Sequence, residues 1–317
     1  MAAEEWIQIC KKNINMPVKK FLFIFLLMVS ANGFAQSSSY AYKVDSKDSA
    51  YVLSTGLIDS TIMVLKRRLL NSGYINCTVL YNSAKKEFTV ENKGDLEEEF
   101  ARKWLIKPCE VFFYETYSPV ELAEILAAGD KQGKIKDDKM TFYKLLNFTG
   151  NMDSYSRVSD IGTLTGPDAG AFSEVKKKLK PFLPEDCRFA YSKEITYSGH
   201  ASIASVQVYA LRNNEWKLPV YKMLGSAKMG VDYRGRPTIS IRFNEFGRKQ
   251  FARFTMKNIN KAIAIVVDGL VYSAPFVNSE IEGGNAEIAG VFTKQEAKQF
   301  ADMLSAGYLP VRLTLIR

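Results

Sequence analysis

The sequence is poor in the residue types that build most catalytic and metal sites. Its 317 residues include one histidine, His200, within a stretch rich in glycine and serine. A metal site needs several ligands, so a lone histidine predicts an ordinary loop residue. The chain also lacks a His/Cys/Asp cluster at ligand spacing, a glycine-rich phosphate loop and a Gly-x-Ser-x-Gly motif. We therefore expect no catalytic residues, no metal and no cofactor, and an enzyme is the disfavoured class.

Cysteine is scarce, and the charge is only mildly one-sided. After the first 35 residues three cysteines remain, Cys77, Cys109 and Cys187, and an odd number does not make a disulfide framework. One pair is possible, and the sequence does not select it. The net charge of +9 includes one dense basic run, at 176–180, without interleaved aromatic residues. That pattern predicts a solvated helix face and disfavours nucleic acid as a partner.

Long apolar runs are confined to the N-terminal region. Two lysines precede the apolar run 21–29, and a small-residue site ending at Ala35 follows it. This order is typical of a secretory signal peptide, and the run is too short to span a membrane. The sequence thus predicts a signal peptide at 1–35, cleavage near Ala35 and export to the periplasm, with Met16 as an alternative start. An uncleaved anchor is the other interpretation. We expect no membrane span after cleavage.

Residues 50–128 predict the order strand, helix, strand, strand, helix, strand. An apolar stripe at helical spacing marks the first helix, from Ile58 to Leu69, and Gly73 is expected to end it. Alternating apolar and polar residues mark the strands. The predicted strands are 51–54, 75–81, 86–91 and 109–116. After them, Ser118-Pro-Val-Glu has the pattern of a capping box that opens another helix.

Residues 238–317 predict the same order again. Asp268-Gly269 stands between two apolar strands and is a strong signal for a two-residue hairpin turn, so a structural role is expected for both residues. Thr293 begins a second capping box, and Gly307 is expected to close the last helix. Two such units predict an α+β fold in which two ferredoxin-like halves, 50–128 and 238–317, form a base.

The segments outside these halves have a different character. Residues 36–49 are polar and rich in serine, and we predict a flexible linker there. Residues 129–237 predict a small inserted α+β subdomain. It would contain a charged linker at 129–140, a helix at about 171–180, and short strands near 187–193, 204–211 and 216–223.

Several blocks resemble, in the same order, the first periplasmic domain of the SecD/SecDF family of protein-export membrane subunits. KAIAIVVDGLVYSAP at 261–275 and SAGYLPVRL at 305–313 resemble the end of that domain. FFYETYSPVELAEIL at 112–126 resembles a strand and helix of SecDF from Bacteroidetes-type bacteria, and 156–194 resembles the segment that opens their inserted region. One departure is FTVENKGD at 88–95, which lacks the Pro-Gly turn of the family.

The resemblance implies a polypeptide-binding role without a motor. In the family, this domain leads into membrane helices whose ionisable residues couple proton flow to export, and here the sequence stops at Arg317. The family's inserted head subdomain is thought to hold emerging chains, and it would correspond to 129–237. The candidate polypeptide contacts in that region are Phe182, Tyr191, Tyr197, Tyr209, Trp216 and Tyr221, with core packing as the alternative for each.

We therefore expect a non-catalytic, exported protein that binds unfolded or translocating polypeptide, or subunits of the Sec translocon. Exposed strand edges and apolar grooves would take up an extended chain by strand addition. The competing hypothesis is an envelope scaffold that uses the same domain for one specific folded partner unrelated to export.

Overall fold

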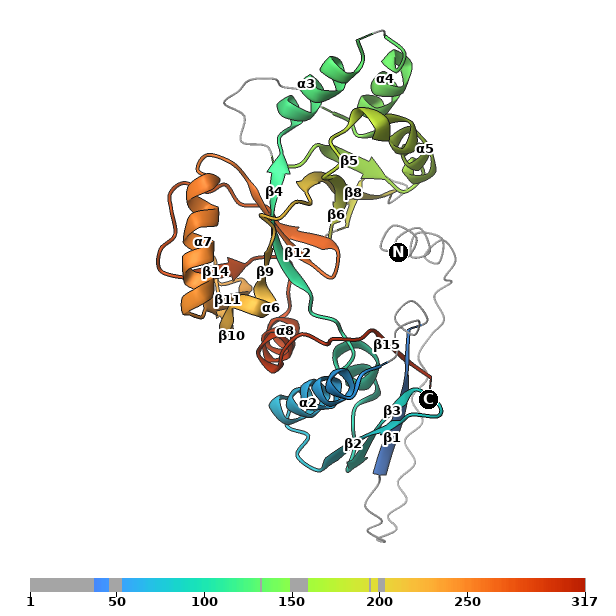
Figure 1. Ribbon diagram of the computed structural model, residues 1–317, viewed down its shortest axis with the longest axis vertical. Helices are drawn as coiled ribbons and strands as arrows, with labels where there is room; N and C mark the ends of the chain where they lie inside the picture. Colours follow the sequence, from blue (N-terminus) through green and yellow to red (C-terminus); the bar gives the residue numbers. More distant parts are fainter. Residues whose placement is uncertain are drawn as a thin grey trace. The chain divides into compact units, whose positions relative to one another are not determined.

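The computed structural model divides into two compact units (Figure 1). The central unit is formed by residues 109–305, and the terminal unit by the described residues before 109 and after 305. The structure describes residues 37–45, 53–131, 133–148, 159–193, 195–198 and 203–316. The signal peptide predicted at 1–35 and His200, predicted to be a loop residue, lie outside these ranges.

The terminal unit contains one four-stranded antiparallel sheet in the order β15-β1-β3-β2. Its strands are β1 (Ser37–Val44), β2 (Cys77–Asn82), β3 (Glu87–Lys93) and β15 (Leu313–Leu315). Helix α2 (Thr55–Asn71) connects β1 to β2, and Ser54 caps it by accepting a hydrogen bond from the Leu57 N–H. A short π-helix (Phe100–Trp104) follows β3.

The prediction of a flexible linker at 36–49 is wrong for residues 37–44, which form β1. The serines at its start suggested a flexible segment, but Tyr42 and Val44 are buried in the core of the sheet. The Tyr40 hydroxyl donates to the Leu96 carbonyl at 3.0 Å, and the Tyr42 hydroxyl donates to the Ala101 carbonyl at 3.2 Å. These long-range contacts, rather than local propensity, order the segment.

Five strands of the central unit close a ring. Strand β4 (Val111–Tyr117) pairs with β12 (Ile263–Val267) on one side and with β8 (Ile203–Arg212) on the other. Strands β6 (Cys187–Ser192) and β13 (Leu270–Ser273) complete the circuit between β8 and β12. One buried cluster draws residues from all five strands: Tyr114, Ala190, Tyr209, Leu211, Ala264, Val266 and Val271.

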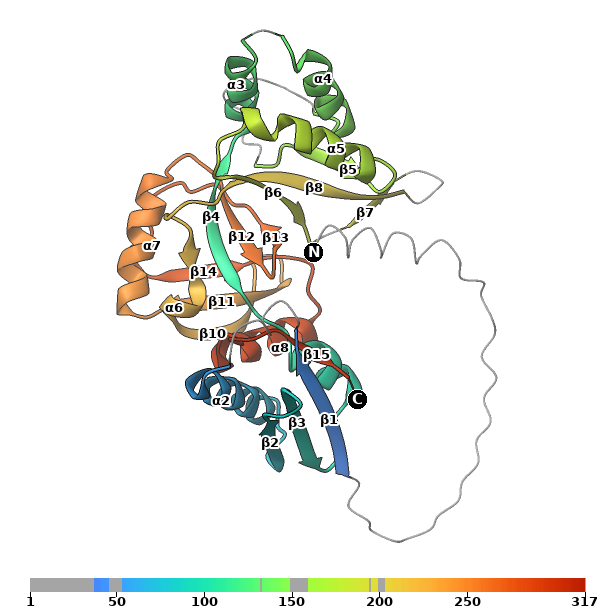
Figure 2. The same ribbon diagram turned by 45° about the vertical axis from the view of Figure 1, so that its right-hand side comes forward.

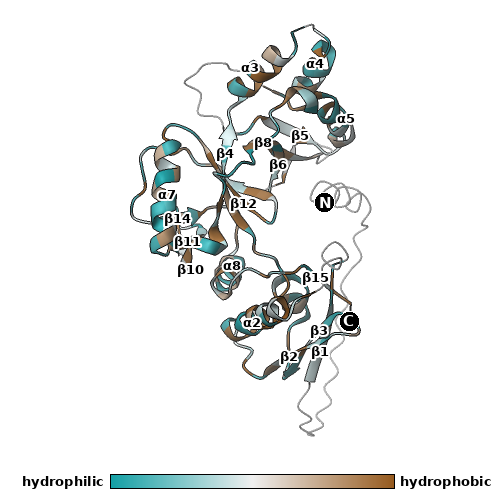
Figure 3. Ribbon diagram, in the orientation of Figure 1, coloured by the Kyte–Doolittle hydropathy of each residue, from teal (hydrophilic) through white to brown (hydrophobic). Residues whose placement is uncertain are grey.

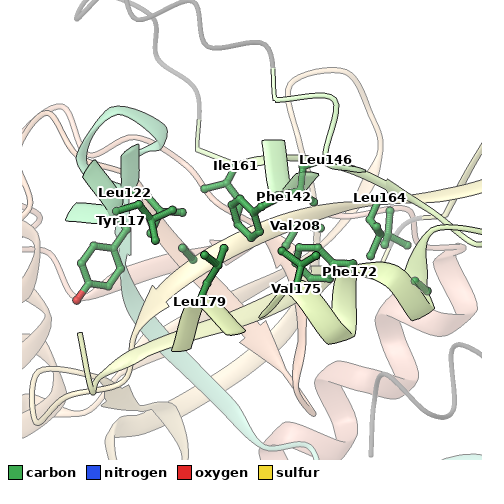
Figure 4. Packing of buried hydrophobic residues seen from close by; sticks show 14 of the residues in the cluster. Tyr117, Leu122, Phe142, Leu146, Ile161, Leu164, Phe172, Val175, Leu179 and Val208 are labelled. Atoms are coloured by element: carbon green, nitrogen blue, oxygen red, sulfur yellow. The ribbon is translucent and has the colours of Figure 1, made fainter. Parts of the chain in front are cut away.

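At one end of the ring, three helices cover a second core. These are α3 (Pro119–Gly129), α4 (Lys136–Leu145) and α5 (Ala169–Leu179), which Figure 1 shows gathered beside β5 (Gly162–Thr165) and β8. Figure 4 shows Phe142 and Phe172 within this core. Their rings stack with centroids 5.6 Å apart, and both side chains are fully buried. Strand β7 (Thr196–Ser198) pairs with β8 nearby.

A separate three-stranded antiparallel sheet lies in the same unit, in the order β10-β11-β14. Its strands are β10 (Leu224–Val231), β11 (Pro237–Phe243) and β14 (Asn285–Ile288). Helix α7 (Glu245–Lys257) lies beside this sheet in Figure 2 and buries Phe251 and Phe254. In Figure 3 most of α7 has the colours of hydrophilic residues, as expected for a helix with one buried face. Phe246 and Met256 are its exposed apolar residues. Helix α8 (Lys294–Ala306) precedes β15.

The fold class α+β is confirmed, but strand pairing differs from the predicted halves. The strand predicted at 109–116 forms β4 in the ring of the central unit, and β15 is the neighbour of β1 in the terminal sheet. The strands predicted within 238–317 lie in three different sheets. Every strand offers the same backbone groups, so local patterns identify strands without identifying their partners.

Two local predictions in 129–237 are also wrong. Residues 136–140 of the charged linker predicted at 129–140 belong to α4, because Ile135, Phe142 and Leu146 recur at helical spacing and are buried. The strand predicted at 216–223 is reduced to the two-residue β9 (Leu218–Pro219), followed by the short helix α6 (Val220–Met223).

Candidate polypeptide-binding surface

Three of the six candidate aromatic residues pack against hydrophobic cores. Tyr209 is 5% exposed and belongs to the cluster of the five-stranded ring, where its hydroxyl donates to Gln207 Oε1 at 3.1 Å. Phe182 and Tyr191 are half-buried and pack against the core of α3, α4 and α5. Burial also raises the pKa of Tyr191. These three side chains therefore contribute mainly to the fold.

Tyr197 lies in β7 opposite Ala204, and its side chain is outside the described set.

The remaining two candidates are exposed and close to each other in sequence. Trp216 is 43% exposed and Tyr221 is 40% exposed. The backbone N–H of Trp216 donates to Asn214 Oδ1 at 3.0 Å. This hydrogen bond closes a tight turn after β8. Strand β9 then pairs with β4, so that Pro219 lies opposite Phe112. This pairing brings Tyr221 to Phe112, with ring centroids 6.2 Å apart and an interplanar angle of 85°.

Three lysines accompany these rings, and the Nζ atom of Lys222 lies 5.8 Å from the centroid of the Tyr221 ring. The Nζ atom of Lys257 lies 4.0 Å from the centroid of the Trp216 ring, and that of Lys217 lies 5.6 Å from the centroid of the Phe112 ring. Cations at such distances are attracted to the faces of aromatic rings. Phe112, Trp216 and Tyr221, with Lys217 and Lys257, are called the aromatic surface below.

A buried carboxylate holds Lys257 beside Trp216. Glu115 in β4 is almost fully buried, and its Oε1 atom lies 3.0 Å from Lys257 Nζ. The buried amide of Asn258 donates to the same oxygen at 3.1 Å. A buried charge is tolerated when it is paired and hydrogen-bonded, so this arrangement fixes the lysine instead of leaving it mobile. The aromatic surface is therefore supported by the core beneath it.

Sequence reasoning missed three members of this surface. Phe112 and Lys257 lie outside the predicted inserted subdomain, and Lys217 is one of many lysines. The pairing of β9 with β4 joins them, and a two-residue strand leaves no periodic pattern in the sequence. The aromatic residues Trp216 and Tyr221 were the usable signals.

The other predicted site residues have structural surroundings. Asp268 and Gly269 form the two-residue turn between β12 and β13, with φ angles of 49° and 89°. The Asp268 carboxylate accepts the Glu110 N–H at 2.8 Å and so ties the turn to the start of β4. Within the described ranges, no group of three or more histidine, cysteine, aspartate or glutamate residues could hold a metal ion.

The arrangement of strands and helices is similar to that of a solved structure of SecDF. That structure is described as a membrane component that enhances protein export. The likeness covers 88% of this chain and 98% of the other, with a TM-score of 0.51 and 20% sequence identity. A crystal structure of SecDF in a super-membrane-facing form matches with the same TM-score, over 29% of its own chain. The fold is thus one found in a protein-export component.

Sequence comparisons also find similarity to proteins of the SecD/SecDF family. Residues 221–311 match the family model for the SecDF P1 head subdomain. The chain is 42% identical over 95 residues to protein translocase subunit SecD of Acidaminococcus fermentans, and 35% identical over 134 residues to that of Calditerrivibrio nitroreducens. It is 43% identical over 90 residues to SecDF of Thermus thermophilus. The predicted resemblance to the SecD/SecDF family is confirmed.

These matches cover parts of the proteins. They span 30%, 42% and 28% of this chain, and 23%, 26% and 12% of the three relatives. The chain thus spans about a quarter or less of the length of the curated relatives it matches. The head-subdomain match includes only residues 221–237 of the predicted inserted subdomain and most of the predicted second half. No helix in the described part of the chain combines the length and apolarity needed to cross a membrane.

Proposed function

We propose that this protein is a non-catalytic accessory of protein export that binds unfolded or translocating polypeptide. The observation that carries the proposal is the match of residues 221–311 to the SecDF P1 head subdomain. The names of the relatives, protein translocase subunits SecD and SecDF, support a role in export. Subunits of the Sec translocon are the second expected class of partner.

The aromatic surface supports binding to unfolded chains. An emerging polypeptide exposes apolar side chains that a folded protein buries, and large rings offer them contact area. Trp216 and Tyr221 are exposed, whereas Tyr209 is taken up by the core. Lys217 and Lys257 add positive charge beside the rings. The proposed mechanism is passive, because holding a chain that has emerged disfavours its return.

The proposed location follows from the N-terminal region. Residues 1–35 have the sequence pattern of a signal peptide with cleavage near Ala35, and we place the protein in the periplasm on that basis. An emerging client would be accessible there.

The terminal unit supports the presence of one ferredoxin-like unit in this protein. Its strand order β15-β1-β3-β2 is the fourth-first-third-second order of a ferredoxin-like sheet, with α2 between the first two strands. In this proposal one ferredoxin-like unit is built from both ends of the chain.

Binding to a client in two states tests the proposal. Protein beginning at Gln36 is titrated with a secretory protein that is reduced and permanently unfolded, and separately with its folded form. We expect micromolar affinity for the unfolded form alone. The double variant Trp216→Ala/Tyr221→Ala should bind at least about fivefold more weakly, because truncated aromatic anchors lose apolar contact.

The control is Phe246→Ala, which removes an exposed ring on α7 outside the aromatic surface. It should bind the unfolded client as the wild type does. Absence of binding to either form would refute the proposal and favour an envelope scaffold with one folded partner.

A further inference from the structure

Strand β10 is an edge of the three-stranded sheet. The order β10-β11-β14 leaves one long side of β10 without a strand partner in that sheet. An edge strand presents a row of backbone N–H and C=O groups that another extended chain can bond. Two observations identify which residues of β10 present those groups.

The first observation is the pairing of β11. The Phe243 N–H donates to the Gly284 carbonyl at 2.9 Å, on the side of β14. Backbone groups alternate between the two sides of a strand, so Ile241 and Ile239 also face β14. Their partners in β10, Ala227 and Met229, are therefore turned away from β11.

The second observation is the position of Ser305 in α8. Its hydroxyl accepts the Ala227 N–H at 3.3 Å and donates to the Ala227 carbonyl at 2.9 Å. A side chain on the free side of β10 thus satisfies both outward backbone groups of one residue. This confirms the direction in which the edge faces, and it closes the edge at Ala227.

C-terminal to Ala227, the outward edge of β10 has no strand partner among the described residues. Met229 and Val231 follow Ala227 at the same alternation, and their side chains are 41% and 59% exposed. No described residue outside the sheet forms a backbone hydrogen bond with either of them. Two consecutive outward residues can bond a short extended segment through four backbone groups.

The two faces beside this edge differ in chemistry. Met229 and Val231 are apolar and project to the same face as the buried Ala227. On the opposite face, Lys228, Arg242 and Glu287 line a hollow of about 490 Å³ whose other walls include Ser226 and Ser240. Two positive side chains and one negative one thus line it. A segment that binds along β10 would match these faces best with apolar side chains beside Met229 and Val231. On the opposite face, acidic side chains would lie beside Lys228 and Arg242.

We propose that an extended, apolar-acidic polypeptide segment adds to the free edge of β10 as a further strand. Backbone hydrogen bonds to Met229 and Val231 hold the segment, and Lys228 and Arg242 select acidic side chains. Ser305 sets one end of the binding edge. This inference rests on the proposed function and specifies where and how part of a client chain binds.

The direct test uses a fluorescent ten-residue peptide of alternating valine and glutamate. Met229→Pro removes an outward N–H that the sheet does not use, and proline is tolerated on edge strands. We expect this variant to bind the peptide at least about tenfold more weakly than the wild type. Met229→Leu keeps the N–H and should bind within about twofold of the wild type.

Two further experiments test whether weaker peptide binding by Met229→Pro comes from a folding defect. Ser305→Ala frees the outward groups of Ala227 and should strengthen peptide binding severalfold. The same peptide with every backbone nitrogen methylated keeps its side chains but loses its donors, and it should not bind the wild type. Equal binding of the methylated peptide would overturn strand addition.

The unfolded secretory protein separates failure of this inference from failure of the proposed function. If it binds the wild type and Met229→Pro equally while the peptide binds neither, the β10 edge is not a binding site and the proposed function stands. If it fails to bind the wild type, the proposed function fails, and this inference fails with it.

Discussion

The guanidinium of Arg68 donates a hydrogen bond to the Gly307 carbonyl, 3.1 Å away and 239 positions later in the chain. Arg68 is fully buried in the terminal unit. It also donates to the Leu105 carbonyl at 2.8 Å and to the Lys107 carbonyl. These carbonyls lie where the chain leaves the terminal unit and where it returns. One buried cation therefore ties both crossings of the chain to α2.

Replacing Arg68 with methionine should destabilise the protein by about 3 kcal/mol, because it leaves one buried and several part-buried carbonyls without this donor. Urea denaturation monitored by circular dichroism measures the change. The matched control is Arg67→Met, since Arg67 is exposed on the same helix. Similar stability of the two variants would contradict a structural role for Arg68.

The core of α3, α4 and α5 predicts a second stability effect. Phe142 is fully buried against Phe172, so Phe142→Ala should create a cavity and lower the free energy of unfolding by about 3–5 kcal/mol. The comparison variant is Met140→Ala, because Met140 is exposed two residues earlier in α4. Thermal unfolding should show a large shift for the first variant and little for the second.

Two glycines predict effects of different kinds. Gly269 adopts a φ of 89° in the turn between β12 and β13, where a β-carbon is strained, so Gly269→Ala should cost about 1 kcal/mol. Gly170 lies in α5 without a positive φ, and an added β-carbon meets no atom within 4 Å. Gly170→Ala should leave stability unchanged or raise it. Loss of stability in the second variant alone would reverse this interpretation.

The Cys187 thiol should react much more slowly in folded protein than in unfolded protein. Burial, with a smaller contribution from the neighbouring Asp186 carboxylate, raises the pKa of its thiol to about 12. Little thiolate is then present at pH 8.5, whereas an unfolded cysteine with a pKa of about 8.5 is half ionised. Iodoacetamide should modify Cys187 at least about a hundredfold more slowly in native protein than in urea.

Peptide mass spectrometry of protein beginning at Gln36 follows this reaction at each cysteine. Equal rates for Cys187 in both conditions would show that the thiol is accessible and ionised in the folded state.

Local chemistry was the part of the fold that could be predicted. Ser118 caps α3 by accepting the Glu121 N–H at 3.1 Å, as the Ser-Pro-Val-Glu pattern indicates. The turn at Asp268-Gly269 joins two adjacent strands, as that dipeptide indicates. Each of these features depends on residues within a few positions of one another, so a single window of sequence contains the information.

The candidate site could be predicted only in part. Trp216 and Tyr209 are both aromatic residues close to the end of β8, but Trp216 is exposed and Tyr209 is buried in the core of the ring. Exposure depends on which strands surround a residue, and β8 has neighbours from distant parts of the chain. Composition alone therefore could not separate binding candidates from core residues.

Local sequence patterns were sufficient to predict the positions of most helices and strands, several caps and turns between them, and the family resemblance. Tertiary structure decided which strands pair: β1 was predicted as a linker, yet it lies between β3 and β15. It also left the edge of β10, past its contact with Ser305, without a partner in the described part of the chain. Every residue except proline offers the same backbone donor and acceptor, so the partner of a strand is selected by burial of side chains across the whole chain.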